Sequence, residues 1–213
     1  MTITWYGYAC FRIETREAVL VVDPFSKGIG LTPPRFQADV ILISHGHPNH
    51  ANIAAIGGTP LVIQGPGEYE TRGVTVRGIP SYHDPRQGKD RGLNTIYRIE
   101  ADGISIAHLG DFGERTLREE TLEALGDVDV LLIPVGGTDT IGAEDAAGIV
   151  RQLEPRVVIP MHYRLPGLTV TLDPADRFLA TYGGRGPQRL AKLTLKPKDL
   201  PDTDTRIVLL STE

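Results

Sequence analysis

The sequence predicts an α+β chain in which two mixed β-sheets pack face to face and helices lie outside them. The first half of the chain consists of short strand-like runs, and the second half alternates strand-like runs with helical segments. The 24 glycines and 16 prolines indicate many turns between short elements. Because 213 residues with 40% hydrophobic content suit one core, we expect residues 1–213 to form a single domain.

Short apolar runs bounded by turn residues predict the strands of the first half. Val40–Ile43 is a continuous, mostly β-branched run, which is typical of a strand buried on both faces. Asp102 and Gly103 separate two such runs and predict a hairpin, whereas residues 84–92 predict a polar loop. The expected strands are Ile3–Tyr6, Cys10–Glu14, Val19–Val22, Val40–Ile43, Leu61–Gln64, Val74–Arg77, Thr95–Glu100 and Ile104–His108.

Helices enter the pattern in the second half. Thr116–Leu125 is expected to be a helix, with Thr116 as its N-cap and Glu119 as the capping-box partner. The other expected helices are Ala143–Leu153 and Pro174–Tyr182, and the expected strands are Val130–Ile133, Val157–Ile159, Leu190–Leu195 and Arg206–Leu210.

Composition excludes several classes of function. A net charge of −5 argues against a protein that coats nucleic acid, which usually carries a basic stripe. The lone Cys10 cannot form an internal disulfide and suits a reducing cytoplasm. Met1–Trp5 shows no signal-peptide pattern, and no run approaches the roughly 18 apolar residues of a membrane span. We therefore expect a cytoplasmic protein that does not coat nucleic acid and spans no membrane; whether it forms a homo-oligomer stays open.

Histidines gather where the Val40–Ile43 run ends. Three of the chain's six histidines lie in the hexapeptide His45-Gly46-His47-Pro48-Asn49-His50, and neutral imidazole is the commonest metal ligand. On an extended backbone His45 and His47 share one face, so both can reach one ion. His50 follows a turn and can approach a second ion. Further ligands must come from distant segments, and the candidates are His83, His108, Asp111 and His162.

The hexapeptide after a buried strand resembles the H-x-H-x-D-H motif of the metallo-β-lactamase superfamily. The superfamily's other landmarks follow in order between about Ile3 and Tyr163. The segments that carry the resemblance are Ser81–Asp84, Gly110–Asp111 and Pro160–Tyr163, together with Val22–Phe25 and Ile133–Gly137, which resemble the branch containing ascorbate-6-phosphate lactonase. The resemblance implies an αββα sandwich with metals at one edge.

The resemblance also implies roles for single residues. Six positions would bind one or two divalent ions, with Zn²⁺ expected first and Mn²⁺ as the alternative. The implied enzyme is a hydrolase that uses a metal-bound water or hydroxide on an ester, lactone or phosphodiester, in a small and anionic substrate. In this assignment His45, His47 and His83 bind the first ion, His50 and His162 bind the second, and Asp111 bridges them.

Asn49 departs from the superfamily motif, which has aspartate at this place. A neutral amide is a weaker zinc ligand than a carboxylate. In one interpretation Asn49 is a catalytic residue that still hydrogen-bonds the attacking water. In the other, the chain is an impaired, single-metal or non-catalytic metal-binding member. A third alternative, a di-iron oxidoreductase, is less favoured because His47 stands where those relatives have glutamate.

His108 competes with His83 for the third place at the first ion. His108 precedes Asp111 by an odd offset, and on a regular strand such residues face opposite sides. We therefore assign the metal to His83 and a catalytic place in the pocket to His108, with a structural histidine as the equal alternative. Two softer candidates are Asp23, as a residue that orients a ligand histidine or caps a turn, and Asn94, as an oxyanion donor or a turn residue.

Overall fold

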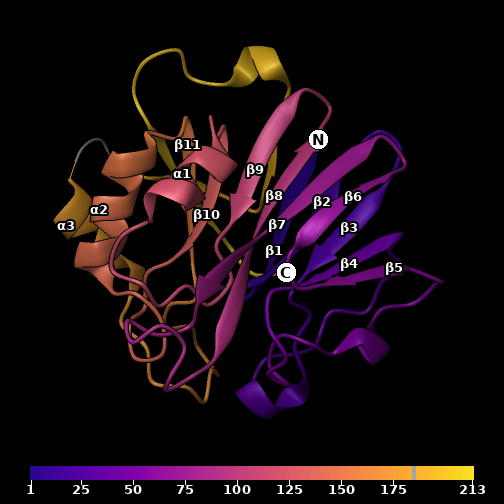
Figure 1. Cartoon of the computed structure of the whole chain (residues 1–213), viewed down its shortest axis with the longest axis horizontal. Coiled ribbons are helices and arrows are strands. Elements are labelled where there is room, and N and C mark those ends of the chain that lie inside the picture. The colour runs from indigo at the N-terminus through magenta and orange to yellow at the C-terminus, as the bar shows by residue number, and fades with distance from the viewer. Residues whose placement is uncertain (184–185) are drawn as a thin grey trace.

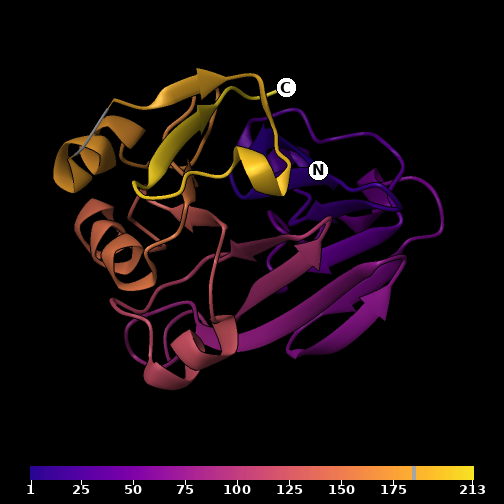
Figure 2. The ribbon, with the colours of Figure 1, turned by 90° about the horizontal axis from the view of Figure 1, so that it is seen from above.

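The computed structural model of the chain describes residues 1–183 and 186–213. Two mixed β-sheets lie face to face, one of six strands and one of eight (Figure 1). The helices α1 (Glu119–Leu125), α2 (Ala143–Leu153) and α3 (Ala175–Tyr182) lie outside the eight-stranded sheet (Figure 2). This confirms the predicted fold class.

The six-stranded sheet has the order β13-β1-β2-β3-β4-β5. Its strands β1, β2 and β3 are antiparallel neighbours, whereas β3, β4 and β5 run parallel. The bounds are β1 (Thr2–Gly7), β2 (Cys10–Glu14), β3 (Val19–Val22), β4 (Val40–Ile43), β5 (Leu61–Gln64) and β13 (Lys192–Thr194).

The eight-stranded sheet has the order β12-β14-β11-β10-β9-β8-β7-β6. The strands from β6 to β9 form an antiparallel meander, and those from β9 to β12 run parallel. The bounds are β6 (Gly67–Thr71), β7 (Val74–Tyr82), β8 (Leu93–Ala101), β9 (Ile104–His108), β10 (Val130–Pro134), β11 (Val157–Met161), β12 (Gln188–Leu190) and β14 (Arg206–Leu210).

Alternating side chains give the six-stranded sheet two buried faces. Phe11, Leu20 and Leu42 belong to the main core, which contains buried residues from both sheets. Their neighbours Cys10 and Val21 belong to a second cluster on the opposite face. That cluster also contains residues of the segments that precede and follow β4: Ile29 of the 3₁₀ turn η1 (Lys27–Ile29), and Ile56, which directly follows the 3₁₀ turn η2 (Ile53–Ala55). The loops around β4, which carry the histidine hexapeptide, are therefore packed on the sheet.

The hairpin at Asp102 and Gly103 forms as predicted, and both residues have positive φ angles, of 55° and 75°. Several other expectations were wrong. Helix α1 begins at Glu119 with Arg118 as its N-cap, so Thr116 does not cap it. The side chain of Gln152 is the reason: it accepts a hydrogen bond from Leu117 N and donates one to Leu117 O, which holds this backbone outside the helix.

Strand ends were the other source of error. β7 continues past Arg77 through Gly78 and Pro80, because it pairs with β8 as far as Tyr82, opposite Leu93. The exposed edge strand β6 was not predicted. The run expected as one strand, Leu190–Leu195, divides at Ala191: Leu190 pairs with β14 in one sheet, and Leu193 pairs with β1 in the other.

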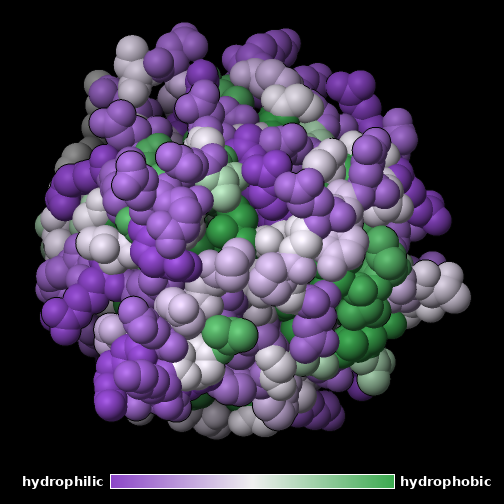
Figure 3. Space-filling view, in the orientation of Figure 1, coloured by the Kyte–Doolittle hydropathy of each residue, from purple (hydrophilic) through white to green (hydrophobic). Residues whose placement is uncertain are grey.

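The surface is mostly polar, with an apolar area on the side where β5 lies (Figure 3). β5 is an edge strand, and its Leu61 and Val62 are 45% and 39% exposed. Among the helices that the structure describes, none has the length and apolar run that a membrane span needs.

Candidate metal centre

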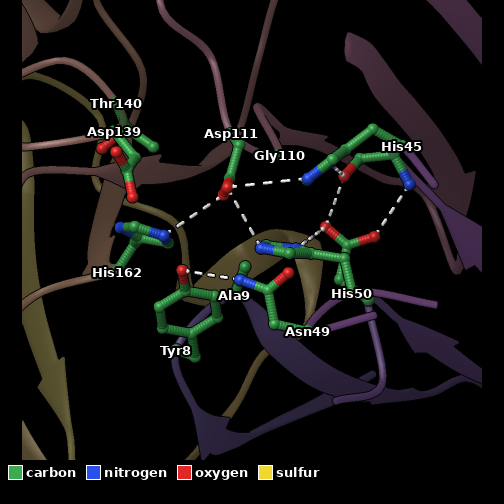
Figure 4. Close-up of polar contacts among 12 residues, drawn as sticks. Tyr8, Ala9, His45, Asn49, His50, Gly110, Asp111, Asp139, Thr140 and His162 are labelled. Atoms are coloured by element: carbon green, nitrogen blue, oxygen red, sulfur yellow. Dashed lines mark hydrogen bonds and ion pairs between the residues drawn. The ribbon is translucent and has the colours of Figure 1, made fainter. Parts of the chain in front are cut away.

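Four strands end at one edge of the sandwich, and each end delivers a polar side chain. β4 ends directly before Ser44 and the histidine hexapeptide, and β7 ends directly before His83. β9 ends three residues before Asp111, and β11 ends directly before His162. The sheets are tied together here, since Thr95 N of β8 donates to Ser44 O over 2.9 Å. The parallel and antiparallel order of the strands thus brings distant segments into one cluster (Figure 4).

The structure brings all six predicted ligands together. His45, His47 and His83 offer ring nitrogens that lie within 4.8 Å of one another, and His45, His50 and Asp111 form a second group of the same compactness. His162 Nε2 lies 3.4 Å from Asp111 Oδ1. Only His47 of these residues is exposed. The centre is therefore buried and opens to solvent on the side of His47.

Asp111 lies close to histidines of both groups. Its Oδ2 is 3.1 Å from Nε2 of His50, 3.3 Å from Nε2 of His83 and 3.7 Å from Nε2 of His45. The carboxylate is 1% exposed. Burial by itself raises the pKa of Asp111, but His50 and His162 hold it well below the usual range of a carboxyl group. Asp111 is therefore an anion in the middle of a buried set of imidazoles.

The ring nitrogens around Asp111 fit a divalent metal. Among the described residues, the Nε2 atoms of His45, His50 and His162 and the Oδ1 atom of Asp111 are buried and have no hydrogen-bond partner. Such unpaired buried atoms cost about 1–3 kcal/mol each. A nitrogen lone pair that faces a carboxylate oxygen at 3.1 Å is repelled unless a proton or a cation lies between them. Imidazole nitrogens with one carboxylate are a ligand set that suits zinc.

Asp23 fixes the orientation of two of these histidines. Its Oδ2 lies 3.1 Å from His50 Nδ1 and accepts a hydrogen bond from Ser44 Oγ over 2.7 Å. Because Ser44 Oγ donates to Asp23, it accepts from Nδ1 of His45, at 2.9 Å. Both histidines then carry a proton on Nδ1 and turn Nε2 toward Asp111, where a metal can bind once Nε2 is unprotonated. Through the contact with His50, Asp23 lies where a residue that orients a ligand histidine is expected.

The backbone is strained at three residues of the centre. Asp23, His162 and Tyr8 have φ angles of 47°, 51° and 55°, in the left-handed region that non-glycine residues rarely occupy. Tertiary contacts hold this geometry; His162 N, for example, donates to Tyr8 O over 2.9 Å. Strained backbone that the surrounding structure enforces is typical of functional sites.

Asn94 holds the loop that carries Asp111. Asn94 Oδ1 accepts from Asp111 N over 3.0 Å, and its Nδ2 donates to Ser81 Oγ and to Leu109 O, over 2.8 and 2.9 Å. Both amide hydrogens are used, so the expectation of an oxyanion donor was wrong. A side chain at Gly110 would place its Cβ 2.5 Å from Asn94 Oδ1, which explains the glycine before Asp111.

His108 does not act in the pocket, and the catalytic place expected for it was wrong. Its Nε2 donates to Ala9 O over 2.9 Å, and its Nδ1 accepts from Gly110 N over 3.0 Å. The residue is fully buried, and neither nitrogen is left for a metal or a substrate. β9 ends at His108 and Asp111 lies in the following loop, so the alternation of faces along a regular strand does not apply to this pair. His108 is a structural histidine.

His83 is held in position by the loop of residues 84–92, which the sequence predicted only as a polar loop. The next residue, Asp84, is buried and accepts hydrogen bonds from four backbone amides, over 2.8–3.1 Å; they belong to Arg86, Gly88, Asp90 and Arg91. His83 N donates to Gly92 O over 3.1 Å, which closes the loop. Asp84 thus makes residues 84–92 a rigid support for a ligand histidine.

Asn49 contacts Tyr8, a residue for which the sequence gave no signal beyond the preceding glycine. Asn49 Nδ2 donates to the Tyr8 hydroxyl over 2.9 Å (Figure 4). The Tyr8 ring lies against two histidines, with centroids 4.0 Å from His162 and 5.0 Å from His50. Burial, followed by the nearby Asp111 carboxylate, raises the pKa of Tyr8. Tyr8 is therefore a neutral hydroxyl inside the cluster of ligands.

Comparison with known proteins decides the family. A model of the β-lactamase superfamily domain matches residues 2–162. The UPF0173 metal-dependent hydrolase of Thermococcus kodakarensis is 33% identical over 191 residues, which cover 76% of this chain and 84% of the relative. The chain belongs to this family of metal-dependent hydrolases.

Two further relatives agree with this assignment. The UPF0173 metal-dependent hydrolase of Archaeoglobus fulgidus is 31% identical over 207 residues, which cover 83% of this chain and 88% of the relative. A crystal structure from Thermotoga maritima, described as a zinc-dependent hydrolase of the metallo-β-lactamase superfamily, has a TM-score of 0.83 and 35% identity, covering 100% of this chain and 99% of that one. The predicted superfamily and fold are confirmed, whereas the lactonase branch stays a prediction.

His83 and His108 can be separated by mutation. We expect His83→Ala to lower the affinity of the hydrolase for the first Zn²⁺ by more than about tenfold, because it removes a nitrogen from the group with His45 and His47. We expect His108→Ala to lower the melting temperature, since it breaks two buried hydrogen bonds, and to leave metal stoichiometry unchanged. Calorimetric titration of Zn²⁺ into each metal-free variant measures both; a larger loss of affinity in His108→Ala would contradict the assignment.

Metal binding should release a proton from His50. Burial alone lowers the pKa of His50, but Asp111 and then Asp23 raise it to about 10. At pH 8, below that pKa, metal-free His50 is protonated, and a metal must displace this proton to reach Nε2. We expect about one proton released per chain at pH 8, and affinity that falls as the pH is lowered. Zinc titrations in buffers of different ionisation enthalpy measure the release, and a value of zero would contradict the position of His50.

Proposed function

We propose that this hydrolase binds two divalent ions, with zinc as the first candidate and manganese as the second, and cleaves an ester, lactone or phosphodiester bond in a small anionic molecule. His45, His47 and His83 would hold one ion, His50 and His162 the other, and Asp111 both. The observation that carries the proposal is the set of buried Nε2 atoms that face Asp111 without a hydrogen-bond partner among the described residues. Divalent ions of this kind, when bound, lower the pKa of water toward neutrality and polarise a carbonyl or phosphoryl oxygen.

The chain's own residues prepare the centre for this reaction. Asp23 and Ser44 hold the Nδ1 atoms of two histidines in place, so that Nε2 of each is the nitrogen turned toward the metal before any metal arrives. The carboxylates of Asp23 and Asp111 are 1% exposed, and charges interact more strongly there than in water. The centre therefore needs little reorganisation when metal and substrate bind.

Two features support an anionic substrate. The centre concentrates positive charge once dications are bound, and it does so in a chain of net charge −5. Loop 84–92, which follows His83, also carries Lys89 and Arg91, and Arg91 forms an ion pair with Asp139. The charge of Asp139 acts on the pKa of Tyr8 and on that of His47, so Asp139 lies close to the centre (Figure 4). An incoming phosphate or carboxylate could take the place of Asp139 at the Arg91 guanidinium.

The alternatives are less well supported. A di-iron oxidoreductase would require a carboxylate ligand where this chain has His47. A non-catalytic metal-binding protein was considered because of Asn49, but the Asn49 side chain has a defined partner in Tyr8 within the cluster, and every other ligand of the superfamily motif is present.

The experiment that tests the proposal measures metal content and turnover together. We expect purified protein grown without chelator to contain zinc or manganese and to hydrolyse bis(p-nitrophenyl) phosphate, a p-nitrophenyl ester or a lactone. The double variant His45→Ala, His47→Ala should lose both properties, beyond the about 10- to 100-fold loss typical of removing an outer partner of a ligand. Circular dichroism checks that it folds. Unchanged metal content in the double variant, or a metal-loaded wild type that turns over none of the three substrates, would contradict the proposal.

Asn49 should make the second ion the weaker one. Asn49→Asp adds a negative charge beside His50 and should retain the second metal at a chelator concentration that removes it from the wild type. Asn52→Asp is the matched control, because it adds the same charge to the same loop, where Asn52 Nδ2 donates to Phe25 O rather than to the centre. Metal equivalents per chain after dialysis measure the effect. Two tightly held ions in the wild type, with no gain in Asn49→Asp, would show that Asn49 does not weaken the site.

A further inference from the structure

The Tyr8 hydroxyl is a polar group inside the centre that the proposed function leaves without a role. Tyr8 is 1% exposed and directly follows β1. Its ring centroid lies 4.0 Å from that of His162 and 5.0 Å from that of His50, so the ring packs on two candidate ligands of the second ion. Figure 4 shows the hydroxyl between Asn49 and His162, on the side where Asp111 lies.

The backbone of Tyr8 is held in one position. Its φ angle of 55° is a costly conformation for a bulky side chain. Two hydrogen bonds to its carbonyl oxygen maintain it, from His162 N over 2.9 Å and from Trp5 Nε1 over 3.1 Å. A tyrosine that needs only to fill space would not require this geometry, and a fixed ring places its hydroxyl oxygen at a fixed point.

Asn49 determines which way the hydroxyl hydrogen points. The Nδ2 group of an amide only donates, so the Tyr8 oxygen is the acceptor of their 2.9 Å hydrogen bond. The hydrogen of Tyr8 is then directed away from Asn49. Within residues 1–183 and 186–213 the hydroxyl has no second hydrogen-bond partner, so a buried donor is left for a ligand.

Tyr97 shows what a structural tyrosine hydroxyl looks like in the same molecule. It is fully buried, like Tyr8, but it donates to Ile43 O over 2.7 Å and accepts from Gly65 N over 3.2 Å. Its donor and acceptor capacities are both used by backbone groups, at Ile43 and Gly65. The contrast with Tyr8 therefore does not follow from burial alone.

We infer that Tyr8 donates a hydrogen bond to an oxyanion of the bound substrate, a phosphoryl or carboxyl oxygen, and that Asn49 is the positioning residue that turns the Tyr8 hydrogen toward it. This deepens the proposed function and rests on its metal groups. A fixed donor aimed at a negative oxygen in a buried site stabilises that charge without reorganisation. An amide at position 49 can turn the Tyr8 hydrogen toward the substrate, whereas a carboxylate could not, because it would accept that hydrogen itself.

The test uses inorganic phosphate as the probe and zinc-loaded protein, with metal equivalents measured in each sample. Tyr8→Phe keeps the ring on His162 and removes only the hydroxyl. We expect it to keep the metal content of the wild type and to bind phosphate about ten- to a hundredfold more weakly in calorimetric titration, the range for one hydrogen bond to a charged group. Tyr97→Phe, which also loses one buried hydroxyl, should bind phosphate like the wild type.

The inference is overturned if Tyr8→Phe binds phosphate as tightly as the wild type, or if Tyr97→Phe loses as much phosphate affinity as Tyr8→Phe. It is also overturned if Tyr8→Phe loses the second metal, because the hydroxyl would then be a metal ligand. A metal-loaded wild type that binds no phosphate would overturn it as well. The proposed function fails separately, through absence of metal or of turnover. If Tyr8→Phe does not fold, 3-fluorotyrosine placed at position 8 replaces it. Its ¹⁹F resonance should shift on addition of phosphate while 3-fluorotyrosine at position 97 does not, and an unshifted signal at position 8 would overturn the inference.

Discussion

Asp111 places one buried negative charge among the ring nitrogens of four histidines, and much of the surrounding structure holds that arrangement. The carboxylate has Nε2 atoms 3.1–3.7 Å away on both sides, and Asp23 and Ser44 orient two of these histidines, His50 and His45, through their Nδ1 atoms. Without a cation or a proton between them these groups repel one another. A metal ion between these groups would relieve the repulsion, which is the physical reason for assigning a metal centre to these residues.

The fold meets this constraint by ending strands at one edge. β4 and β11 lie in different sheets, yet His45 and His162 both reach Asp111 because the sheets pack face to face and the polypeptide turns sharply at each strand end. Positive φ angles at Asp23 and His162 are the local cost of these turns. Positions 110 and 113 are glycines because a side chain has no room there: a Cβ at Gly113 would lie 2.3 Å from the backbone of His83.

Much of this was predictable from the sequence where a pattern was local. The continuous apolar run Val40–Ile43 and the hexapeptide after it predicted a strand and a cluster of ligands, and β2 to β5, β9 and α2 have the predicted bounds. Errors arose where tertiary contacts decide. Gln152 shortens α1 from a distant helix, and Leu190 and Leu193 join different sheets. No sequence pattern shows that the nitrogens of His108 bind the backbone of Ala9 and Gly110, nor that Asn49 contacts Tyr8.

The amide of Asn49 lacks the negative charge of a carboxylate but donates a hydrogen bond to the Tyr8 hydroxyl. A carboxylate at this position would attract the second cation more strongly, whereas the amide donates to Tyr8 and leaves the hydroxyl hydrogen free for a ligand.

Both consequences assume cations at the histidine groups. Anomalous diffraction from a crystal soaked in zinc locates such cations directly. We expect one anomalous peak beside His45, His47 and His83 and another beside His50, His162 and Asp111, the residues proposed to hold the two ions. A fully soaked crystal with no peak at either group would contradict this expectation.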